Sequence, residues 1–258
     1  MRYQDLTSPE IDALDREATV LLLPIGAVEQ HGEHMPVGTD TMLAEALCLA
    51  AAGRRPGTLV LPPPWYGYSP HHMRFAGSIT LGAETLLAVV GDVVGSVVRH
   101  GFRRLVIVNG HGGNASLVGV MAATLGERHY GAARIAGVTY FQLAAAAIAG
   151  RRRSGAGGMG HACEFETSLM LHVAPELVRV EKAAATYPDP GSAYLSTDLV
   201  AGTAVRTYLD FADLSASGTL GDPTLASAAQ GAGFFEDCAA ALTAFVADFG
   251  GWPVERGG

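Results

Sequence analysis

The chain has 258 residues, of which 49% are hydrophobic and 16% are charged, and its formal net charge is −8. This balance is typical of a well-packed globular protein and excludes an intrinsically disordered one. The acidic charge argues against nucleic acid as a partner, because no basic stripe offsets it. No apolar run is long enough to cross a bilayer, so a membrane protein is not expected either.

Three cysteines, Cys48, Cys163 and Cys238, lie far apart and fit no metal-binding or redox spacing. Since no hydrophobic signal segment is visible near the N-terminus, we expect a soluble protein of the reducing cytoplasm. The length suits one large α/β domain and no convincing linker divides the chain, so a single domain over residues 1–258 is predicted. The one dense basic run, residues 151–153, is interpreted as a solvated loop tip.

Helical and extended apolar patterns alternate along the chain. In chain order we predict a strand at 19–25, a helix from residue 39 or 40, a strand at 58–61, a helix at 84–100, a strand at 105–108, a helix at 115–129, a strand at 134–140, a glycine-rich loop at 150–160, a helix from residue 161 and a last helix at 225–249. Such alternation predicts a three-layer α/β/α fold, with a mostly parallel sheet and helices on both of its faces.

Metal-ligating side chains follow two of the predicted strands. Glu29 and His31 come after the first strand, Asp40 lies nine residues beyond His31, and His111 follows the strand at 105–108. Ligands bind beyond the carboxyl ends of the strands in open α/β sheets, so we expect these side chains to meet. In an extended stretch Glu29 and His31 point the same way, because side chains alternate. Carboxylate and imidazole groups in this combination suit a pair of divalent metal ions.

A further acid lies in the helix predicted after the glycine-rich loop. Glu166 has Phe165 and residues 169–171 around it, where a carboxylate is costly unless it meets a metal or a hydrogen-bond partner. Structural interpretations compete with the functional ones. Asp40 would cap the helix that follows it, and the helix dipole would stabilise Glu164 or Glu166. For Glu164 both interpretations stay open.

The irregular stretch 65–78 carries Ser69, His71 and His72, which are candidates for substrate contact. We assign Ser69 and His72 to substrate binding, with a mobile surface loop as the alternative. Other site types fit less well. The glycines at 112–113 match neither a dinucleotide-binding nor a P-loop spacing. A serine hydrolase is excluded because no G-x-S-x-G elbow is present.

These residues form motifs that closely resemble those of the creatininase (creatinine amidohydrolase) family. The matching segments are residues 24–32, Asp40, residues 109–111 and residues 165–168. The similarity runs in order over nearly the whole chain. It implies a creatininase-type α/β fold, a binuclear centre of zinc, manganese or iron, and hydrolysis of an amide-type C–N bond in a small molecule. Many members are hexamers, so a homo-oligomer is expected.

The resemblance also implies roles for particular residues. The metal-ligand positions of the family are matched by Glu29, His31, Asp40, His111 and Glu166. Among them Asp40 matches the bridging carboxylate. His161 matches the histidine that creatininase uses as an acid/base group beside the metals, and Glu164 is a second candidate for that proton transfer.

Two departures from creatininase itself bear on the substrate. Gly113 stands where creatininase has a carboxylate associated with the metals, and Glu164 is the candidate to supply that charge from across the site. Creatininase closes tryptophans over its substrate, and the matching places here are Phe141 and about Gly157. Phe141 is therefore assigned to substrate binding, and creatinine itself is not expected as the substrate.

The predicted activity is metal-dependent hydrolysis of a cyclic amide, a formamide or a modified peptide. Two cations lower the pKa of a bound water to about 7 and polarise the scissile carbonyl, while His161 or Glu164 passes a proton to the leaving nitrogen. Other family members trim a modified peptide in mycofactocin maturation, or deformylate a nucleotide in flavin or deazaflavin biosynthesis. The alternatives are such a formamide hydrolase, a non-catalytic metal- or ligand-binding protein, and a metal-free α/β enzyme.

Overall fold

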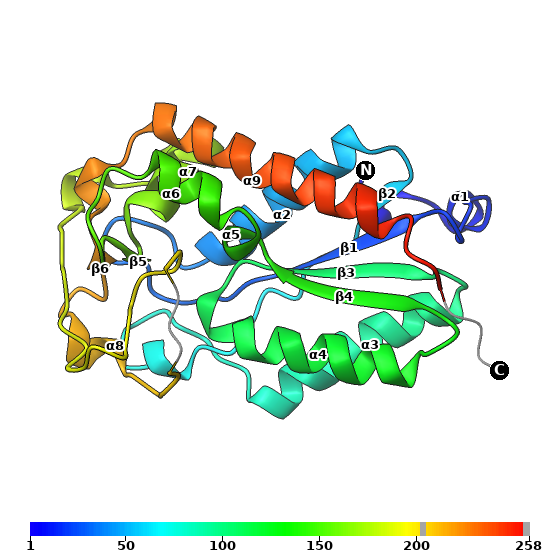
Figure 1. The fold of residues 1–258 in the computed structure, drawn as a ribbon, viewed down its shortest axis with the longest axis horizontal. Helices are drawn as coiled ribbons and strands as arrows, with labels where there is room; N and C mark the ends of the chain where they lie inside the picture. The colour runs from blue at the N-terminus through cyan, green and yellow to red at the C-terminus, as the bar shows by residue number, and fades with distance from the viewer. Residues whose placement is uncertain (202–204, 255–258) are drawn as a thin grey trace.

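A four-stranded parallel sheet forms the centre of the structure, a computed structural model that describes residues 1–201 and 205–254. The strands lie in the order β2 (Thr58–Val60), β1 (Val20–Ile25), β3 (Arg104–Asn109) and β4 (Arg134–Thr139) (Figure 1). In the register of the sheet, Val20 lies opposite Thr58 on one side and Arg104 on the other. Because the strands are parallel, their carboxyl ends all meet at one edge of the sheet.

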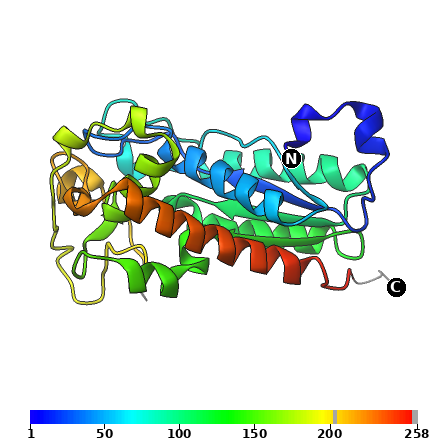
Figure 2. The same cartoon turned by 90° about the horizontal axis from the view of Figure 1, so that it is seen from above.

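Helices cover both faces of this sheet (Figures 1 and 2). One face carries α2 (Thr39–Arg54), α7 (Glu164–Val173) and α9 (Ala228–Phe249), and the other carries α3 (Ala83–Arg99) and α4 (Ala115–Arg128). Within β1, Val20 and Leu22 belong to the first core, whereas Leu21 and Leu23 belong to the second. Strands buried on both faces read as continuous apolar runs, which explains the sequence of β1. The predicted three-layer α/β/α fold is confirmed.

The segment between β4 and α7 differs from the prediction. Two short helices, α5 (Tyr140–Leu143) and α6 (Ala145–Arg151), follow β4 without being predicted. His161 does not open a helix but ends the strand β5 (Met159–His161), which pairs antiparallel with β6 (Leu220–Gly221). Ala162 then adopts a left-handed conformation with φ of 49°. This conformation is uncommon outside glycine, and it separates β5 from the start of α7.

The remaining short elements lie at the edges of the layers. They are α1 (Ser8–Asp12), α8 (Phe211–Leu214) and the 3₁₀ helices η1 (Tyr3–Asp5), η2 (Pro70–His72), η3 (Gly112–Asn114), η4 (Pro175–Leu177), η5 (Val180–Lys182) and η6 (Pro223–Leu225). The three cysteines are buried and unpaired. Among residues 1–201 and 205–254, no helix has both the length and the apolar character needed to span a membrane. That the chain forms a single domain stays a prediction.

In the basic run at residues 151–153, Arg151 and Arg153 are exposed as expected, but Arg151 ends α6 and two of the three arginines form ion pairs. The Arg151 guanidinium pairs with Asp237 of α9 at 2.6 Å, and that of Arg152 pairs with the buried Asp198 at 2.8 Å. These two charges tie the segment before β5 to the rest of the molecule.

Candidate metal centre

A cavity of about 420 Å³ opens beyond the carboxyl ends of β1 and β3. This volume is ordinary for a small-molecule site. The ligand candidates that line it are Glu29, Asp40, His111 and Glu166. Residues 196, 197, 199 and 206–209 also line it, together with two residues of α8, which lies on the left in Figure 1. The cavity therefore lies where an α/β sheet places its ligands.

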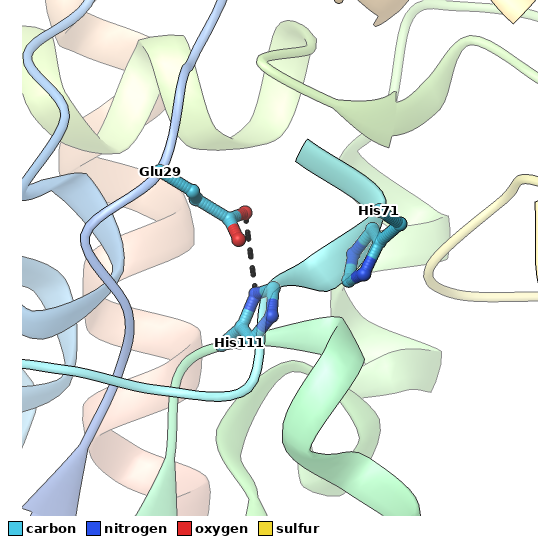
Figure 3. Close-up of side chains that lie close together, drawn as sticks. All are labelled: Glu29, His71 and His111. Carbon is cyan, nitrogen blue, oxygen red and sulfur yellow. Dashed lines mark ion pairs between the residues drawn. The ribbon is translucent and has the colours of Figure 1, made fainter. Parts of the chain in front are cut away.

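His111 approaches two carboxylates through one ring nitrogen. Its Nδ1 lies 3.2 Å from Glu29 Oε1 and 3.1 Å from Asp40 Oδ2. On the other side of the ring, Nε2 lies 3.1 Å from the Tyr68 carbonyl, to which it donates. Figure 3 shows the Glu29 carboxylate and the rings of His111 and His71 around a common space. A histidine whose outer N–H is held by a carbonyl is fixed in the tautomer that binds a metal.

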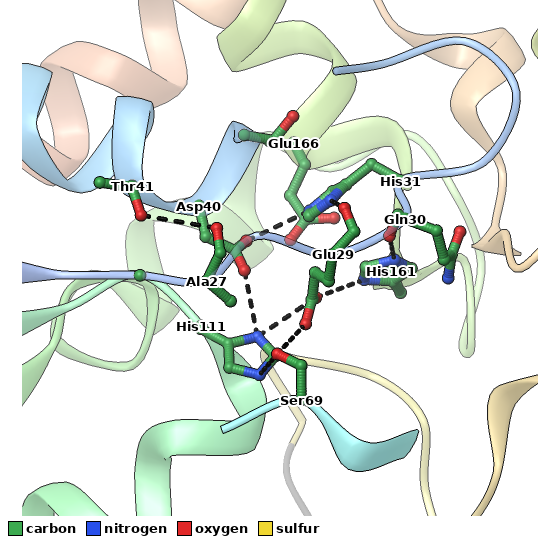
Figure 4. A network of polar contacts seen from close by, with 12 residues as sticks. Ala27, Glu29, Gln30, His31, Asp40, Thr41, Ser69, His111, His161 and Glu166 are labelled. Atoms are coloured by element: carbon green, nitrogen blue, oxygen red, sulfur yellow. Dashed lines mark hydrogen bonds and ion pairs between the residues drawn. The ribbon is translucent and has the colours of Figure 1, made fainter. Parts of the chain in front are cut away.

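His31 and Asp40 have the same arrangement on the opposite side (Figure 4). Nδ1 of His31 donates to the Glu29 carbonyl at 3.1 Å, and Nε2 lies 3.2 Å from Asp40 Oδ1. Asp40 thus directs one oxygen to His31 and the other to His111, as a bridging carboxylate would. The alternative that Asp40 caps α2 is wrong, because the capping position is Gly38 and no side chain makes a capping hydrogen bond there.

Burial and charge pull the pKa values of this cluster in opposite directions. Burial raises the pKa of Glu166 to about 7, with the charges of Asp40 and Glu29 adding to the effect. Burial also raises the pKa of Glu29. For Asp40, burial favours the neutral acid, but His31 and His111 outweigh it and lower the pKa. Burial would lower the pKa of His31, yet Asp40 outweighs burial and raises it to about 9. Carboxylates crowded in this way are stabilised by cations.

Several buried polar atoms of the cluster lack a hydrogen-bond partner among the described residues. They are Glu29 Oε1, Asp40 Oδ2 and His72 Nε2. Each of these carboxylate oxygens lies within 3.3 Å of a histidine ring nitrogen, and the His72 nitrogen lies as close to a carboxylate oxygen, but none of these contacts has hydrogen-bonding geometry. Buried groups of this kind are rare because they cost free energy. Carboxylate oxygens and imidazole nitrogens that converge without bonding each other fit a divalent cation between them.

Four sets of three side chains each offer ligand atoms within 4.8 Å of one another. The sets are Glu29–His31–Asp40, Glu29–His71–His111, Glu29–His72–His161 and His31–His161–Glu166. The five ligands expected from the sequence all belong to these sets. The sets overlap through Glu29, His31 and His161, so together they form one continuous cluster. This donor set fits zinc or manganese.

His161 belongs to two of these sets and lies next to Glu29. Its Nε2 donates to the Gln30 carbonyl at 2.7 Å, which leaves the lone pair of Nδ1 directed to Glu29 Oε1 at 3.7 Å. Burial, and then the charge of His31, lowers the pKa of His161 well below its usual value. The ring is therefore neutral at pH 7 and can accept a proton at Nδ1.

A family model described as creatinine amidohydrolase matches residues 4–246. The chain belongs to the creatininase family. It is 37% identical over 232 residues to the mycofactocin precursor peptide peptidase of Mycobacterium ulcerans, covering 84% of this chain and 82% of that protein. It is 34% identical over 186 residues to the creatinine amidohydrolase of Pseudomonas putida, covering 66% and 71%. Members of this family are hydrolases that act on C–N bonds, and this chain is a metal amidohydrolase of the family.

Solved creatininase structures share the fold and contain metal. A manganese form superposes with a TM-score of 0.80 at 30% identity, covering 95% of this chain and 97% of that one. A creatininase variant described as the Zn-Zn type superposes with the same TM-score and identity, covering 95% and 96%. The cluster of this creatininase-family chain occupies the carboxyl edge of the same fold.

Glu164 does not take the role expected of it. Its carboxylate accepts hydrogen bonds from the backbone N–H groups of Arg153 at 2.8 Å and Ser154 at 2.7 Å, and also from the Gln230 side chain. It is fully buried and does not line the cavity. Both oxygens are thus occupied in holding the segment that leads to β5. The prediction that Glu164 supplies charge or a proton to the metals is therefore wrong, because its carboxylate is bonded away from the cavity.

Of the three residues assigned to substrate binding, Ser69 and His72 lie against the Glu29 carboxylate and Phe141 lies in the core. Ser69 is fully buried, and its Oγ donates to Glu29 Oε2 at 2.6 Å, so it orients a ligand rather than a substrate. His72 lines the cavity, with Nε2 3.3 Å from Glu29 Oε1, and belongs to the ligand cluster. Phe141 packs in the core against Tyr140, at a centroid distance of 5.4 Å, and does not reach the cavity. Its assignment to the substrate is wrong.

Other residues at the site were not identified from the sequence. Asn109 orients His111, because its Nδ2 donates to the His111 carbonyl at 2.7 Å and its Oδ1 accepts from the His111 N–H at 3.0 Å. The N-G-H motif could have predicted this role, because an asparagine side chain two residues before a histidine ligand can bond the backbone of that histidine and fix its position. Arg206 lines the cavity from a turn-rich segment, where no motif marked it.

Proposed function

We propose that this chain hydrolyses an amide C–N bond with two divalent metal ions. The observation that carries the proposal is the convergence of five ligands, four of which line a substrate-sized cavity, with carboxylate oxygens that lack hydrogen-bond partners. Glu29, Asp40 and His111 would hold one ion, and His31, Asp40 and Glu166 the other. When bound, such ions would lower the pKa of a water molecule, which makes it a better nucleophile, and would polarise the amide carbonyl.

The side chains of this site hold and move the proton. His161 is neutral and fixed by the Gln30 carbonyl, so Nδ1 is the atom that accepts a proton and later delivers it to the leaving nitrogen. Ser69 holds Glu29 in position through one oxygen and leaves the other free. Glu164 stays outside this reaction because its oxygens are already bonded.

We further propose a peptide-derived amide, rather than creatinine, as the substrate. The relative with 37% identity is a peptide peptidase, and Phe141 does not cover the cavity, whose aromatic lining comes from Tyr68, Tyr208 and Phe211 instead. Arg206 is the one lysine or arginine among the described residues that line the cavity. Its guanidinium suits a carboxylate on the substrate, such as a peptide C-terminus.

The test combines metal analysis with a substrate panel. Purified protein is stripped with a chelator, reloaded with zinc or manganese, and assayed on creatinine, a formamide and short peptides with free or amidated C-termini. We expect two ions per subunit, chelator-sensitive cleavage of peptides with a free C-terminus, and little turnover of creatinine. His161→Ala is expected to keep both ions and to lose on the order of 10²–10⁴-fold in kcat. His100→Ala, at the exposed end of α3, serves as the matched control.

The outcomes separate the parts of the proposal. A metal content near zero after reloading overturns the binuclear centre. Loss of metal in His161→Ala shows that this residue is a ligand rather than a proton carrier. Efficient creatinine turnover overturns the substrate assignment alone. Light scattering tests the homo-oligomer, by family resemblance a hexamer.

A further inference from the structure

Gly113 leaves space at the site that a histidine from another segment fills. A Cβ atom placed on Gly113 would lie 2.3 Å from His111 Nε2, 2.6 Å from His71 Cε1 and 2.7 Å from the Tyr68 carbonyl oxygen. Contacts this short do not occur at real side chains, so position 113 accepts only glycine while His71 stays where it is. The absence of a side chain here allows the His71 and His111 rings to stack at 5.6 Å, with an angle of 6° between their planes.

The position of His71 is fixed from several sides. It belongs to η2, whose first residue is Pro70, and proline restricts the backbone at the start of such a turn. On the cavity side the ring packs against Phe211 of α8 at 5.0 Å. The neighbouring ring of His72 lies at 4.3 Å. His71 is half-buried and lines the cavity, so it is held at the edge of the ligand cluster rather than in solvent.

We infer that His71 is a ligand of the metal centre, together with Glu29 and His111. One ligand atom from each of these three residues lies within 4.8 Å of the other two. Within this set, Glu29 Oε1 is buried without a hydrogen-bond partner, so this oxygen is free to bind an ion. Figure 3 shows the three side chains directed toward the same space. The inference rests on the proposed function, because it concerns the ion that Glu29 and His111 would hold.

A histidine ligand at this place has a consequence for metal choice. Imidazole nitrogen suits zinc, whereas carboxylate oxygen suits manganese and magnesium. With His71 and His111 both present, the ion on this side has two nitrogen ligands. We therefore expect this site to prefer zinc over manganese, and His71→Glu to shift the preference toward manganese.

The test measures metal binding rather than turnover. The full chain is titrated with zinc against a chelator of known affinity, and with cobalt, whose visible spectrum reports its ligands. His71→Ala is expected to weaken one of the two zinc equivalents by at least the 10- to 100-fold that loss of an outer-shell partner costs, and to change the cobalt spectrum. His71→Glu is expected to recover affinity with a different spectrum. His100→Ala is expected to behave as the wild type.

The possible failures are distinguishable. If wild-type protein binds two zinc ions and His71→Ala binds them with unchanged affinity and spectrum, the inference is overturned while the hydrolase proposal stands. If the wild type binds no divalent ion, both are overturned. His71→Gln, which keeps much of the side-chain volume, replaces His71→Ala in the comparison if circular dichroism shows that the alanine variant is unfolded.

Discussion

Metal binding to this centre is expected to release protons. In the absence of metal, the pKa of His31 is raised to about 9, because Asp40 outweighs the effect of burial. At pH 7 the ring is therefore protonated, with Nδ1 donating to the Glu29 carbonyl and Nε2 directed to Asp40 at 3.2 Å. A metal ion needs the lone pair of Nε2, so it must displace that proton. A raised histidine pKa thus makes the metal affinity fall as the pH falls.

The size of the effect follows from the pKa values. At pH 7 only roughly 1% of His31 is in the free-base form, which weakens the apparent metal affinity about 100-fold. Each further unit of pH below 7 weakens it about another tenfold. The pKa of His111 is also raised, because Glu29 and Asp40 outweigh its burial. Glu166, with a pKa of about 7, is about half protonated at pH 7. Together these groups predict the release of more than one proton when both ions bind.

Isothermal titration calorimetry in buffers of different ionisation enthalpy measures this number directly. The slope of the observed enthalpy against the buffer enthalpy gives the protons released. His31→Ala is the matched variant, and it should release about one proton fewer for the ions it still binds. A slope near zero in the wild type, or an equal slope in both proteins, would refute the protonation pattern that we derive from the Asp40–His31 contact.

Three further predictions concern other residues of the site. Asp40→Ala should lose more bound metal than His31→Ala, as measured by elemental analysis, because Asp40 faces both histidines; equal losses would argue against bridging. Glu164→Ala should lower the free energy of unfolding in urea by about 1–3 kcal/mol, because it leaves buried amides unpaired, yet keep its metal content; a metal-depleted variant would return Glu164 to the centre. Arg206→Gln should raise KM for peptides with a free C-terminus but not for amidated ones, and equal KM changes would exclude a carboxylate contact.

The sheet and the ligands that follow its strands could be predicted from the sequence. The continuous apolar run of β1 has only one stable environment, a parallel strand buried on both faces. Once β1 and β3 are parallel, Glu29, His31 and His111 must emerge at the same edge. These inferences needed only periodicity and the rule for ligand positions in α/β sheets.

The contributions of loop residues could not be predicted in the same way. His71 and His72 reach the cluster because long-range contacts fix the segment after β2, such as the 2.8 Å bond from the Ser69 N–H to Thr80. The prediction for Phe141 rested on its matching a residue that covers the substrate in creatininase, and such a match does not tell which side of a short helix faces the cavity. In α5 the side that carries Phe141 packs on the core.

The error over Glu164 is different, because helix geometry already contained the answer. Successive residues of an α-helix turn by about 100°, so Glu164 and Glu166 point about 200° apart. Two such carboxylates in one buried helix cannot both face one metal centre. Glu166 faces the cavity, and Glu164 must then satisfy its charge on the opposite side, where the Arg153 and Ser154 amides receive it. Glu166 is thus placed to bind metal. Glu164 instead holds the segment that leads to β5, whose last residue is His161, in position beside the site.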